Sequence, residues 1–538
     1  RGPRSKQLMA APVRVIFLGG LGEIGRNCMV IEQDNRLLLI DCGLMFPDAD
    51  MHGIDLVLPD FTWLRENADR IEACVATHGH EDHVGGLQFL LREMSFPIYG
   101  SQVTLGLARN RIEEAGLLGK TEMIAVKDNE RRRIGPFDVE FIPVTHSVPY
   151  AHAIALHTPQ GVIIHSGDFK IDLTPVDDRR TDLARLGALA AGDGVRLLML
   201  DSTNAEERGS APSEKSVGVV LRQLFAEHKT RRIITASFAS HIHRVQQIAE
   251  AAIDAGRVVA TLGRSMINNI RLARDLKVLT IPEKSLVSAD SLGKYDDEEI
   301  CIISTGSQGE AMSALTNLAK GDSRYVKVGE SDVVIFSSHA IPGNEHNVNK
   351  VIDALLRRGA TVVHSGIADV HATGHAQAED LKTYLNVTVP QWFVPMDRGD
   401  QTLRQKAVQA IADTRWVPEK GENRIRSMVE GRPDWVLSRQ RAWGVPITLF
   451  VRPDGSYLQD PAVNARIVAA VNAEGMDAWN SANKAAFLGP DHNPADYEMV
   501  TDILDVWFDS GCTHAFVLES GRWPDLQWPA NLYLEGSD

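Results

Sequence analysis

Apolar and polar positions alternate in two different ways along the first 345 residues. As far as residue 200, short apolar runs such as 13–18, 37–40 and 162–164 are separated by Gly- and Asp-rich turns, with few helical stretches. Apolar runs bounded by turn residues predict β-strands. From 201 to 345, apolar strands alternate with helical stretches such as 242–255. This alternation predicts a parallel α/β sheet.

The same pattern suggests how the chain is divided into domains. We predict a strand-rich domain over 12–200, a parallel α/β domain over 201–345, and a helix and strand in 346–390 that return to the first domain. A basic extension, 1–11, precedes them, and it lacks the apolar core of an export signal. No apolar run approaches the roughly 18–20 residues of a membrane span. We therefore expect no contact with a membrane.

The composition indicates which classes of binding partner and which cellular compartment to expect. The formal charge of −15 argues against a protein whose whole surface binds nucleic acid. RNA binding would have to depend on local Lys and Arg side chains that contact the phosphates. The 44% hydrophobic and 24% charged residues are typical of soluble globular proteins. Five cysteines, an odd number without C-x-x-C spacing, predict reduced thiols and a cytoplasmic location.

The run 77–83 carries the strongest chemical signal in the chain. It contains four residues that can bind metal, and they are His78, His80, Asp82 and His83. A strand-like segment precedes the run, so the turn is expected to direct the first two to one side and the last two to the other. Two such clusters about 3.5–4 Å apart form a two-metal hydrolytic site. Imidazole and carboxylate donors suit zinc first, then manganese, with magnesium as a further alternative.

Further donors must come from distant strand ends. His146 and Asp168 each end an apolar strand, and a carboxylate at Asp168 could bridge two metals. Taken alone, His146 would more often be a hydrogen-bonded core histidine, but beside the first cluster we interpret it as a ligand. Asp41 also ends a strand, and it is suited to orient a ligand histidine through its other ring nitrogen.

These residues resemble the metallo-β-lactamase superfamily, and later motifs resemble the ribonuclease J branch of its β-CASP nucleases. The motifs are Leu197–Asn204, Thr235–Gln247, Gly263–Met266, Ser304–Glu310, Ile341–Glu345 and His371–His375, in family order, with Thr373 where serine is usual. The resemblance covers about 12–390. It implies an α/β fold, a metallo-β-lactamase αββα sandwich with an inserted parallel β-CASP domain.

The resemblance also implies roles for individual residues. It implies RNA as the substrate, cut internally or trimmed from a 5′-monophosphate end, and Asp82, His375 and Asp201 as catalytic residues. The residues that would hold nucleotide phosphates are Ser240, His241, His371, Ala372, Thr373, Gly374 and His375. A homodimer is left open.

Beyond residue 390 the resemblance changes. Ribonuclease J enzymes carry a Val-His-Gly-Glu-Tyr-Arg motif about twenty residues after the last histidine motif, and its histidine binds the second metal. Asp397 stands at that histidine position, without the rest of the motif, so it is a candidate ligand for a weaker second site.

Residues 391–538 instead resemble part of the catalytic domain of isoleucyl-tRNA synthetase, a class I aminoacyl-tRNA synthetase. The matching segments are Arg432–Ile447, Asp505–Gly511 and Leu532–Asp538. The resemblance implies an amino-acid pocket with Trp507, Glu535 and Asp538. This part lacks the family's two ATP-binding signatures, so aminoacylation and tRNA binding are not expected. Three hypotheses remain: a zinc-dependent ribonuclease, an isoleucine-tRNA ligase fragment, or an inactive chimera of the two.

Overall fold

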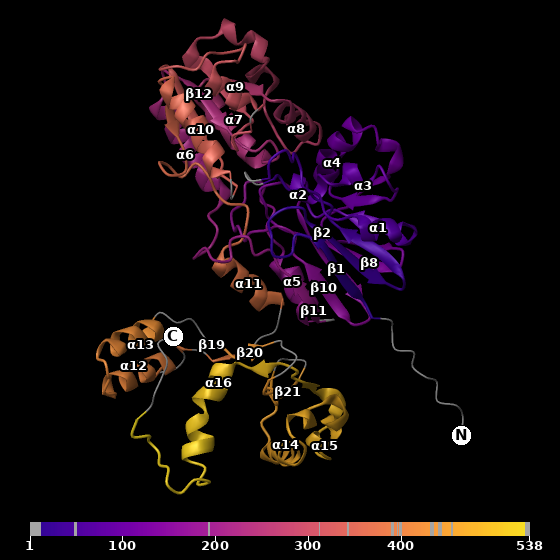
Figure 1. Ribbon diagram of the computed structural model, residues 1–538, viewed down its shortest axis with the longest axis vertical. Helices are drawn as coiled ribbons and strands as arrows, with labels where there is room; N and C mark the ends of the chain where they lie inside the picture. The colour runs from indigo at the N-terminus through magenta and orange to yellow at the C-terminus, as the bar shows by residue number, and fades with distance from the viewer. Residues whose placement is uncertain are drawn as a thin grey trace. The chain divides into compact units, whose positions relative to one another are not determined.

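The structure is a computed structural model, and it divides into two compact units, Arg1–Val389 and Pro390–Asp538. The residues that it describes are 12–47, 51–191, 194–310, 312–341, 344–388, 392–394, 396–397, 401–430, 435–439, 444–452 and 456–532. Figure 1 shows the elements of both units, and each unit is described by itself.

Two mixed sheets form the first part of unit 1. The first has the order β1-β2-β3-β4-β5-β6, with β1 (Arg14–Gly19), β2 (Cys28–Gln33), β3 (Arg36–Ile40), β4 (Ile71–Val75), β5 (Ile98–Gly100) and β6 (Met123–Ala125). The second has the order β11-β10-β9-β8-β7, with β7 (Glu130–Ile134), β8 (Phe137–Pro143), β9 (His152–Thr158), β10 (Gly161–His165) and β11 (Val195–Met199).

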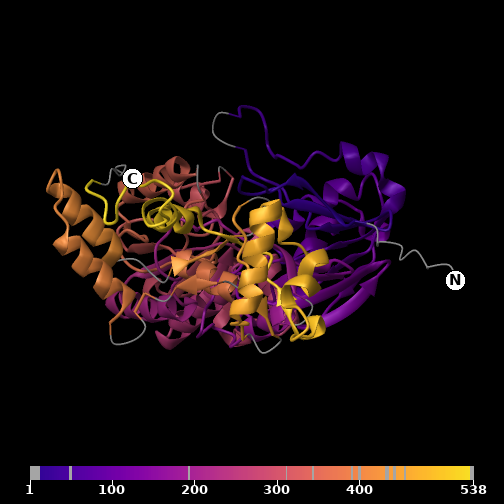
Figure 2. The ribbon, with the colours of Figure 1, turned by 90° about the horizontal axis from the view of Figure 1, so that it is seen from below.

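The two sheets pack face to face around a core of large apolar side chains. Ile31 and Ile40 of the first sheet meet Phe137, Phe141 and Leu156 of the second, and all five are essentially inaccessible to solvent. The helices α1 (Thr62–Glu66), α2 (Glu81–Val84), α3 (Leu87–Leu90) and α4 (Gln102–Glu114) cover the outer face of the first sheet. In Figure 2 the indigo helices lie on one side of the purple strands. Helix α5 (Leu183–Ala191) covers the outer face of the second sheet, which confirms the expected αββα sandwich.

A third sheet has the order β14-β13-β15-β12-β16-β17, and every neighbouring pair is parallel. Its strands are β12 (Arg232–Ala236), β13 (Val258–Leu262), β14 (Leu286–Val287), β15 (Ile300–Ser304), β16 (Asp332–Phe336) and β17 (Thr361–Val363). One face packs on α6 (Glu214–Glu227), α7 (Ile242–Asp254) and α8 (Arg264–Asp275), and the other on α9 (Ala314–Lys320) and α10 (Glu345–Arg357). The predicted parallel α/β sheet is confirmed.

The return to the first domain lies later in the chain than the predicted boundary at 345. Strand β17 pairs with β16 and α10 packs on the same sheet, so both extend the α/β domain. The chain returns where Ala376 donates its N–H to the carbonyl of Phe169. Helix α11 (Ala378–Thr388) then packs beside α5, as Figure 1 shows. Periodicity alone misplaced this boundary because it identifies a helix and a strand but not the sheet they join.

Unit 2 is built from short elements around a smaller core. Its helices are α12 (Leu403–Asp413), α13 (Lys420–Glu430), α14 (Pro461–Glu474), α15 (Lys484–Leu488) and α16 (Val506–Gly511). Its strands are β18 (Phe393–Val394), β19 (Trp435–Val436), β20 (Ser438–Arg439), β21 (Phe450–Val451), β22 (Glu498–Met499) and β23 (Ile503–Leu504). Phe450, Val463, Ile467 and Leu488 are buried together. No helix among the described residues of either unit is long and apolar enough to span a membrane.

A buried ion pair joins α6 to α7 within the α/β domain. The Glu214 carboxylate accepts hydrogen bonds from Nε and NH2 of Arg244 at 2.7 and 2.8 Å, and the Arg244 side chain is fully buried. Burial favours the neutral acid, yet the charges of Arg244 and His241 bring the pKa of Glu214 well below its usual range. A carboxylate with a lowered pKa stabilises the fold above its unfolded pKa of about 4.3, and this stability is lost as the pH falls through the lower folded value.

We therefore expect Glu214→Gln to lower the free energy of unfolding of unit 1 at pH 7 by about 3–5 kcal/mol, because it leaves a buried guanidinium without its counter-charge. The difference from the unchanged chain should begin to shrink below about pH 4, where Glu214 becomes protonated in the unfolded chain but stays ionised in the folded one. Urea denaturation at pH 7 and at pH 3.5 measures both values. The matched control is Glu283→Gln, whose exposed side chain pairs with Arg274 and should have little effect. An unchanged stability at pH 7 in Glu214→Gln would contradict the argument.

Candidate metal centre

The candidate metal ligands gather because several strands end at one edge of the sandwich. The loop after β4 carries His78 and His80, and the loop after β8 carries His146. Asp168 follows β10, and Asp201 follows β11, which runs parallel to β10. Asp82 and His83 lie in the first turn of α2. The chain path thus brings residues from four strand ends to one place.

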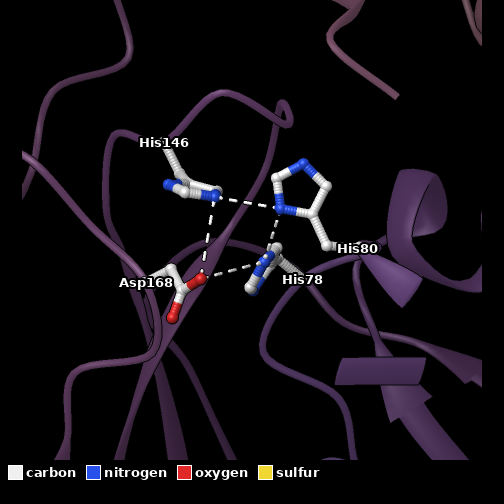
Figure 3. A group of neighbouring side chains, drawn as sticks. All are labelled: His78, His80, His146 and Asp168. Carbon is white, nitrogen blue, oxygen red and sulfur yellow. Dashed lines mark hydrogen bonds and ion pairs between the residues drawn. The ribbon is translucent and has the colours of Figure 1, made fainter. Parts of the chain in front are cut away.

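The first group of donors consists of His78, His80, His146 and Asp168, whose side chains point toward one another (Figure 3). Nδ1 of His80 lies 3.1 Å from Nε2 of His78 and 3.1 Å from Nε2 of His146. Oδ2 of Asp168 lies 3.6 and 3.9 Å from the same two Nε2 atoms. Four donors at zinc bonding distance in a tetrahedron are about 3.3 Å apart. The observed separations therefore fit a single ion.

The second group is formed by Asp82, His83 and again Asp168. Nε2 of His83 lies 3.2 Å from Oδ2 of Asp168 and 3.6 Å from Oδ2 of Asp82. Because Asp168 belongs to both groups, its carboxylate stands where a bridge between two ions would be. The structure divides the four residues of the run 77–83 as the sequence predicts, with His78 and His80 in one group and Asp82 and His83 in the other.

Hydrogen bonds on the other ring nitrogens set the tautomers of these histidines. Nδ1 of His146 donates to the carbonyl of Gly374 at 2.7 Å, and Nδ1 of His83 donates to Oδ2 of Asp41 at 2.7 Å. A carbonyl or carboxylate oxygen can only accept, so in both rings the lone pair of a neutral imidazole lies on Nε2, facing the cluster. Thr77 gives its hydroxyl proton to Asp41 and accepts from Nδ1 of His78. The orienting role expected for Asp41 is confirmed.

The electrostatics suit a cation. Burial lowers the pKa of His78 and of His146, and it lowers the pKa of His80 to about 3 against the opposing charge of Asp168. These three rings are therefore neutral and have lone pairs to share. Burial opposes a charge on His83 as well, but the charges of Asp168 and Asp82 raise its pKa well above the usual value. The carboxylates thus favour positive charge in the second group, which a metal ion would supply.

A third group joins Asp168 to Asp201 and His375. Nδ1 of His375 lies 2.9 Å from Oδ2 of Asp201 and 4.0 Å from Oδ2 of Asp168. Burial disfavours a charge on His375, but Asp201 and Asp168 outweigh it and raise the pKa of His375 to about 9. A protonated imidazole is therefore favoured beside Asp168, and Asp201 holds it in place.

Comparison with known proteins agrees with this geometry. Residues 21–206 match the metallo-beta-lactamase superfamily, and residues 230–355 match the family described as "Ribonuclease J, beta-CASP domain". The chain is 42% identical over 420 residues to ribonuclease J of Mycobacterium tuberculosis, covering 78% of this chain and 74% of that protein. The chain belongs to the ribonuclease J family.

Two further similarities define the extent of the match. Ribonuclease J of Synechocystis is 41% identical over 418 residues, which cover 77% of this chain and 65% of that protein. The match to ribonuclease J of Helicobacter pylori J99 covers 59% of that protein. The chain thus spans less than two thirds of the length of these ribonuclease J relatives. A protein of unknown function from Enterococcus faecalis has a similar fold, with a TM-score of 0.51, 18% identity, and 70% and 92% of the two chains covered.

The structure also locates the other ribonuclease J-like candidates. His241 caps α7 and lines a cavity of about 10 Å³ together with His146, Thr373 and Gly374. Ser240 directly precedes His241, and His371 and Ala372 are mostly buried at the start of the same loop as Thr373 and Gly374. His241, Thr373 and Gly374 therefore lie beside His146, and Ser240, His371 and Ala372 adjoin them along the chain.

Of the four candidate residues in unit 2, the structure describes Asp397 and Trp507. Asp397 belongs to unit 2, and Oδ2 of its exposed carboxylate lies 2.6 Å from NH2 of Arg404. It is not a member of any of the three groups of donors found among the described residues. Trp507 is 56% exposed. Glu535 and Asp538 lie outside the described residues.

Sequence reasoning missed residues that contact the cluster through backbone or amide groups. Nδ2 of Asn27 lies 3.0 Å from Nε2 of His83, and Nδ2 of Asn204 donates to Oγ1 of Thr373 at 2.8 Å. The carbonyl of Gly374 orients His146. Asn27 ends the Gly-rich loop after β1, and that loop was the available signal. Nothing local in the sequence marks a carbonyl as an orienting group.

Proposed function

We propose that this chain is a metal-dependent ribonuclease that hydrolyses phosphodiester bonds of RNA in RNA processing and decay, by 5′→3′ exonuclease or endonuclease cleavage. The observation that carries this proposal is Asp168, which is shared by two groups of metal donors and lies beside the Asp201–His375 pair. The relatives named ribonuclease J support the choice of RNA as substrate.

Zinc is the proposed ion, with Mn²⁺ and Mg²⁺ as alternatives. Three imidazoles and a carboxylate at separations near those of a tetrahedron are a donor set that zinc favours. His78, His80, His146 and Asp168 would hold the first ion, and Asp82, His83 and Asp168 the second. Bound metal ions supply a strong nucleophile at neutral pH and neutralise the charge that develops on phosphate.

The chain's own residues would handle the proton and the leaving group. Asp201 holds Nδ1 of His375, which leaves Nε2 directed away from that carboxylate and free to donate a proton to the leaving oxygen. Asp82 would help to orient the attacking group beside Asp168. In the alternative, Asp201 would be the source of the proton, and His375 would relay it to the leaving oxygen.

Unpaired polar atoms support a phosphate site at the carboxyl edge of the third sheet. Oγ of Ser237 and of Ser338 and Nδ1 of His371 are buried without a hydrogen-bond partner among the described residues. Such atoms are costly unless a ligand or water satisfies them. Parallel sheets bind ligands at this edge. We propose that the nucleotide phosphates of RNA fill this role, with Ser240, Ala372 and the backbone of 373–375 beside them.

The test is hydrolysis of 5′-monophosphorylated single-stranded RNA by the purified chain, together with its metal content after dialysis against a chelator. We expect RNA cleavage and about one tightly held zinc per chain, because the first group has four donors and the second has three, with Asp168 counted in both. Two chelator-resistant zinc ions per chain would contradict the expected weak second site. Absence of cleavage with added Zn²⁺, Mn²⁺ or Mg²⁺ would overturn the ribonuclease proposal.

For unit 2 we infer an isoleucyl-tRNA synthetase-like fragment from its sequence motifs alone. We propose Trp507, Glu535 and Asp538 as remnants of an amino-acid pocket, and Asp397 as a weak ligand that must leave Arg404 to reach a metal. We expect no isoleucine-dependent exchange of pyrophosphate into ATP. Measurable exchange would instead favour the ligase hypothesis.

We further propose that the protein works in the cytoplasm. The support is that all five cysteines, 28, 42, 74, 301 and 512, are free thiols. A homodimer stays a hypothesis that light scattering of the purified chain can test.

A further inference from the structure

Arg244 is a fully buried guanidinium whose hydrogen bonds join three separate parts of the chain. Its Nε and NH2 bind the Glu214 carboxylate at the start of α6. Its NH1 donates to the carbonyl of Ser337, just after β16, at 2.7 Å, and to the carbonyl of Val370 at 3.0 Å. The hydroxyl of Ser337 also donates to Val370, at 2.7 Å. Arg244 thus fastens the backbone directly before the loop 371–375.

That loop contacts the first group of metal donors at its other end. The carbonyl of Gly374 accepts the Nδ1 proton of His146, a residue 228 positions away in the chain. The approach is close, since a Cβ added at Gly374 would lie 2.9 Å from Cε1 of His146 and 3.1 Å from Cβ of Ser147. A small displacement of the loop would therefore rotate or release the His146 ring.

We propose that Arg244 is a positioning residue for the first metal site, acting through the Val370 and Gly374 carbonyls on His146. This inference rests on the proposed binding of metal by that site and not on RNA cleavage. The loop is anchored on its other side by Asp201 and Asn204, which hold His375 and Thr373. Arg244 supplies the anchor from the α/β domain, so the position of that domain is transmitted to a metal ligand of the sandwich.

The alternative is that Arg244 only stabilises the α/β domain. Arg232, the first residue of β12, provides the matched control for this alternative, because it is also a buried arginine of the α/β domain with a bidentate carboxylate partner. Its Nε and NH2 bind Asp332 at 2.7 and 3.1 Å. Its contacts are with Asp297, Lys327 and Asp332 and do not include the loop 371–375. Loss of Arg232 should cost stability without moving His146.

The experiment compares Arg244→Lys, Ser337→Ala and Arg232→Lys in the full chain, with three readouts. These are the zinc dissociation constant by competition with a chromophoric chelator, the visible spectrum of the Co²⁺-loaded protein, and the melting temperature. Lysine keeps the charge of Arg244 but cannot bind a carboxylate and two carbonyls with a planar fork. Partners that orient a metal ligand typically change metal affinity 10–100-fold when mutated.

We expect Arg244→Lys to weaken zinc binding roughly 10–100-fold and to alter the Co²⁺ spectrum. Ser337→Ala should change both in the same direction by less, since it removes one hydrogen bond to Val370. Gly374→Ala, which displaces His146 directly, should give a similar spectral change. Arg232→Lys should lower the melting temperature and leave zinc affinity and the Co²⁺ spectrum as in the unchanged chain.

A folded Arg244→Lys protein with unchanged zinc affinity and Co²⁺ spectrum would overturn the proposal, and so would equal zinc loss in Arg232→Lys. If Arg244→Lys does not fold, Ser337→Ala decides, and an unchanged Co²⁺ spectrum in that variant overturns it. Both decisive readouts report metal binding. A chain that shows the expected metal changes but cuts no RNA would therefore refute the ribonuclease proposal and leave this one standing.

Discussion

Replacing Asp168 by alanine should remove tightly bound metal from the chain and lower RNA hydrolysis by about a thousandfold. Asp168 is the only residue common to the three donor groups found in the described part of the chain. Its Oδ2 lies 3.2 Å from Nε2 of His83 and 3.6 Å from Nε2 of His78. Losing a metal removes several kcal/mol of transition-state stabilisation, and about 4 kcal/mol corresponds to a thousandfold in rate. Zinc content and the cleavage rate measure the two effects.

The control for Asp168→Ala is Asp138→Ala, which removes an aspartate of β8 in the second sheet. Asp138 pairs with Arg131 at 2.8 Å on the partly exposed edge of the second sheet and belongs to none of the three donor groups. It should leave zinc content and cleavage nearly unchanged. If Asp168→Ala retained a full zinc equivalent and near-normal cleavage, the shared-carboxylate arrangement would be wrong.

Replacing His375 by alanine should lower RNA cleavage by about 10²–10⁴-fold, the usual contribution of a positioned acid or base. The effect should be much smaller on a nucleoside p-nitrophenyl phosphate, because nitrophenolate leaves without needing a proton. The ring of His375 is held by Asp201 at 2.9 Å, beside Asp168. Rates for both substrates, measured at saturating metal, separate proton donation from metal binding.

Asp201→Asn provides the companion variant for this prediction. It keeps a hydrogen bond to His375 but removes the charge that favours its protonated form, so it should lower RNA cleavage in the same substrate-dependent way. An equal loss on the two substrates in both variants would show that His375 acts in binding and not as the proton donor. The general-acid role would then have to be assigned elsewhere.

The sequence predicted the site where the residues lie close together in the chain. The spacing of His78, His80, Asp82 and His83 after an apolar strand was enough to predict two groups of donors, and the structure forms those groups. His146 and Asp168 could be added because each ends an apolar strand. Patterns with a period of 2 or 3.6 residues indicate local strand or helix geometry. The residue type alone shows whether a side chain can bind a metal.

Local pattern was insufficient where a residue acts through the backbone or through a distant partner. Strand β17 has the pattern of any buried strand, and only its pairing with β16 shows which sheet it extends. Asp397 has the chemistry of a ligand, but the structure pairs it with Arg404. In both cases the choice depends on which surfaces the folded chain brings together.

By itself the sequence thus determined the class of fold, the order of the strands and helices, and the candidate donor residues of the metal centre. Only the tertiary structure decided that Thr77 and the carbonyl of Gly374 orient those donors, and that Arg244 holds the loop that carries this carbonyl. A carbonyl group occurs at every residue, so no residue type marks the one that accepts a hydrogen bond from His146. Its position depends on the path of the chain between two residues 228 positions apart, which packing and not periodicity determines.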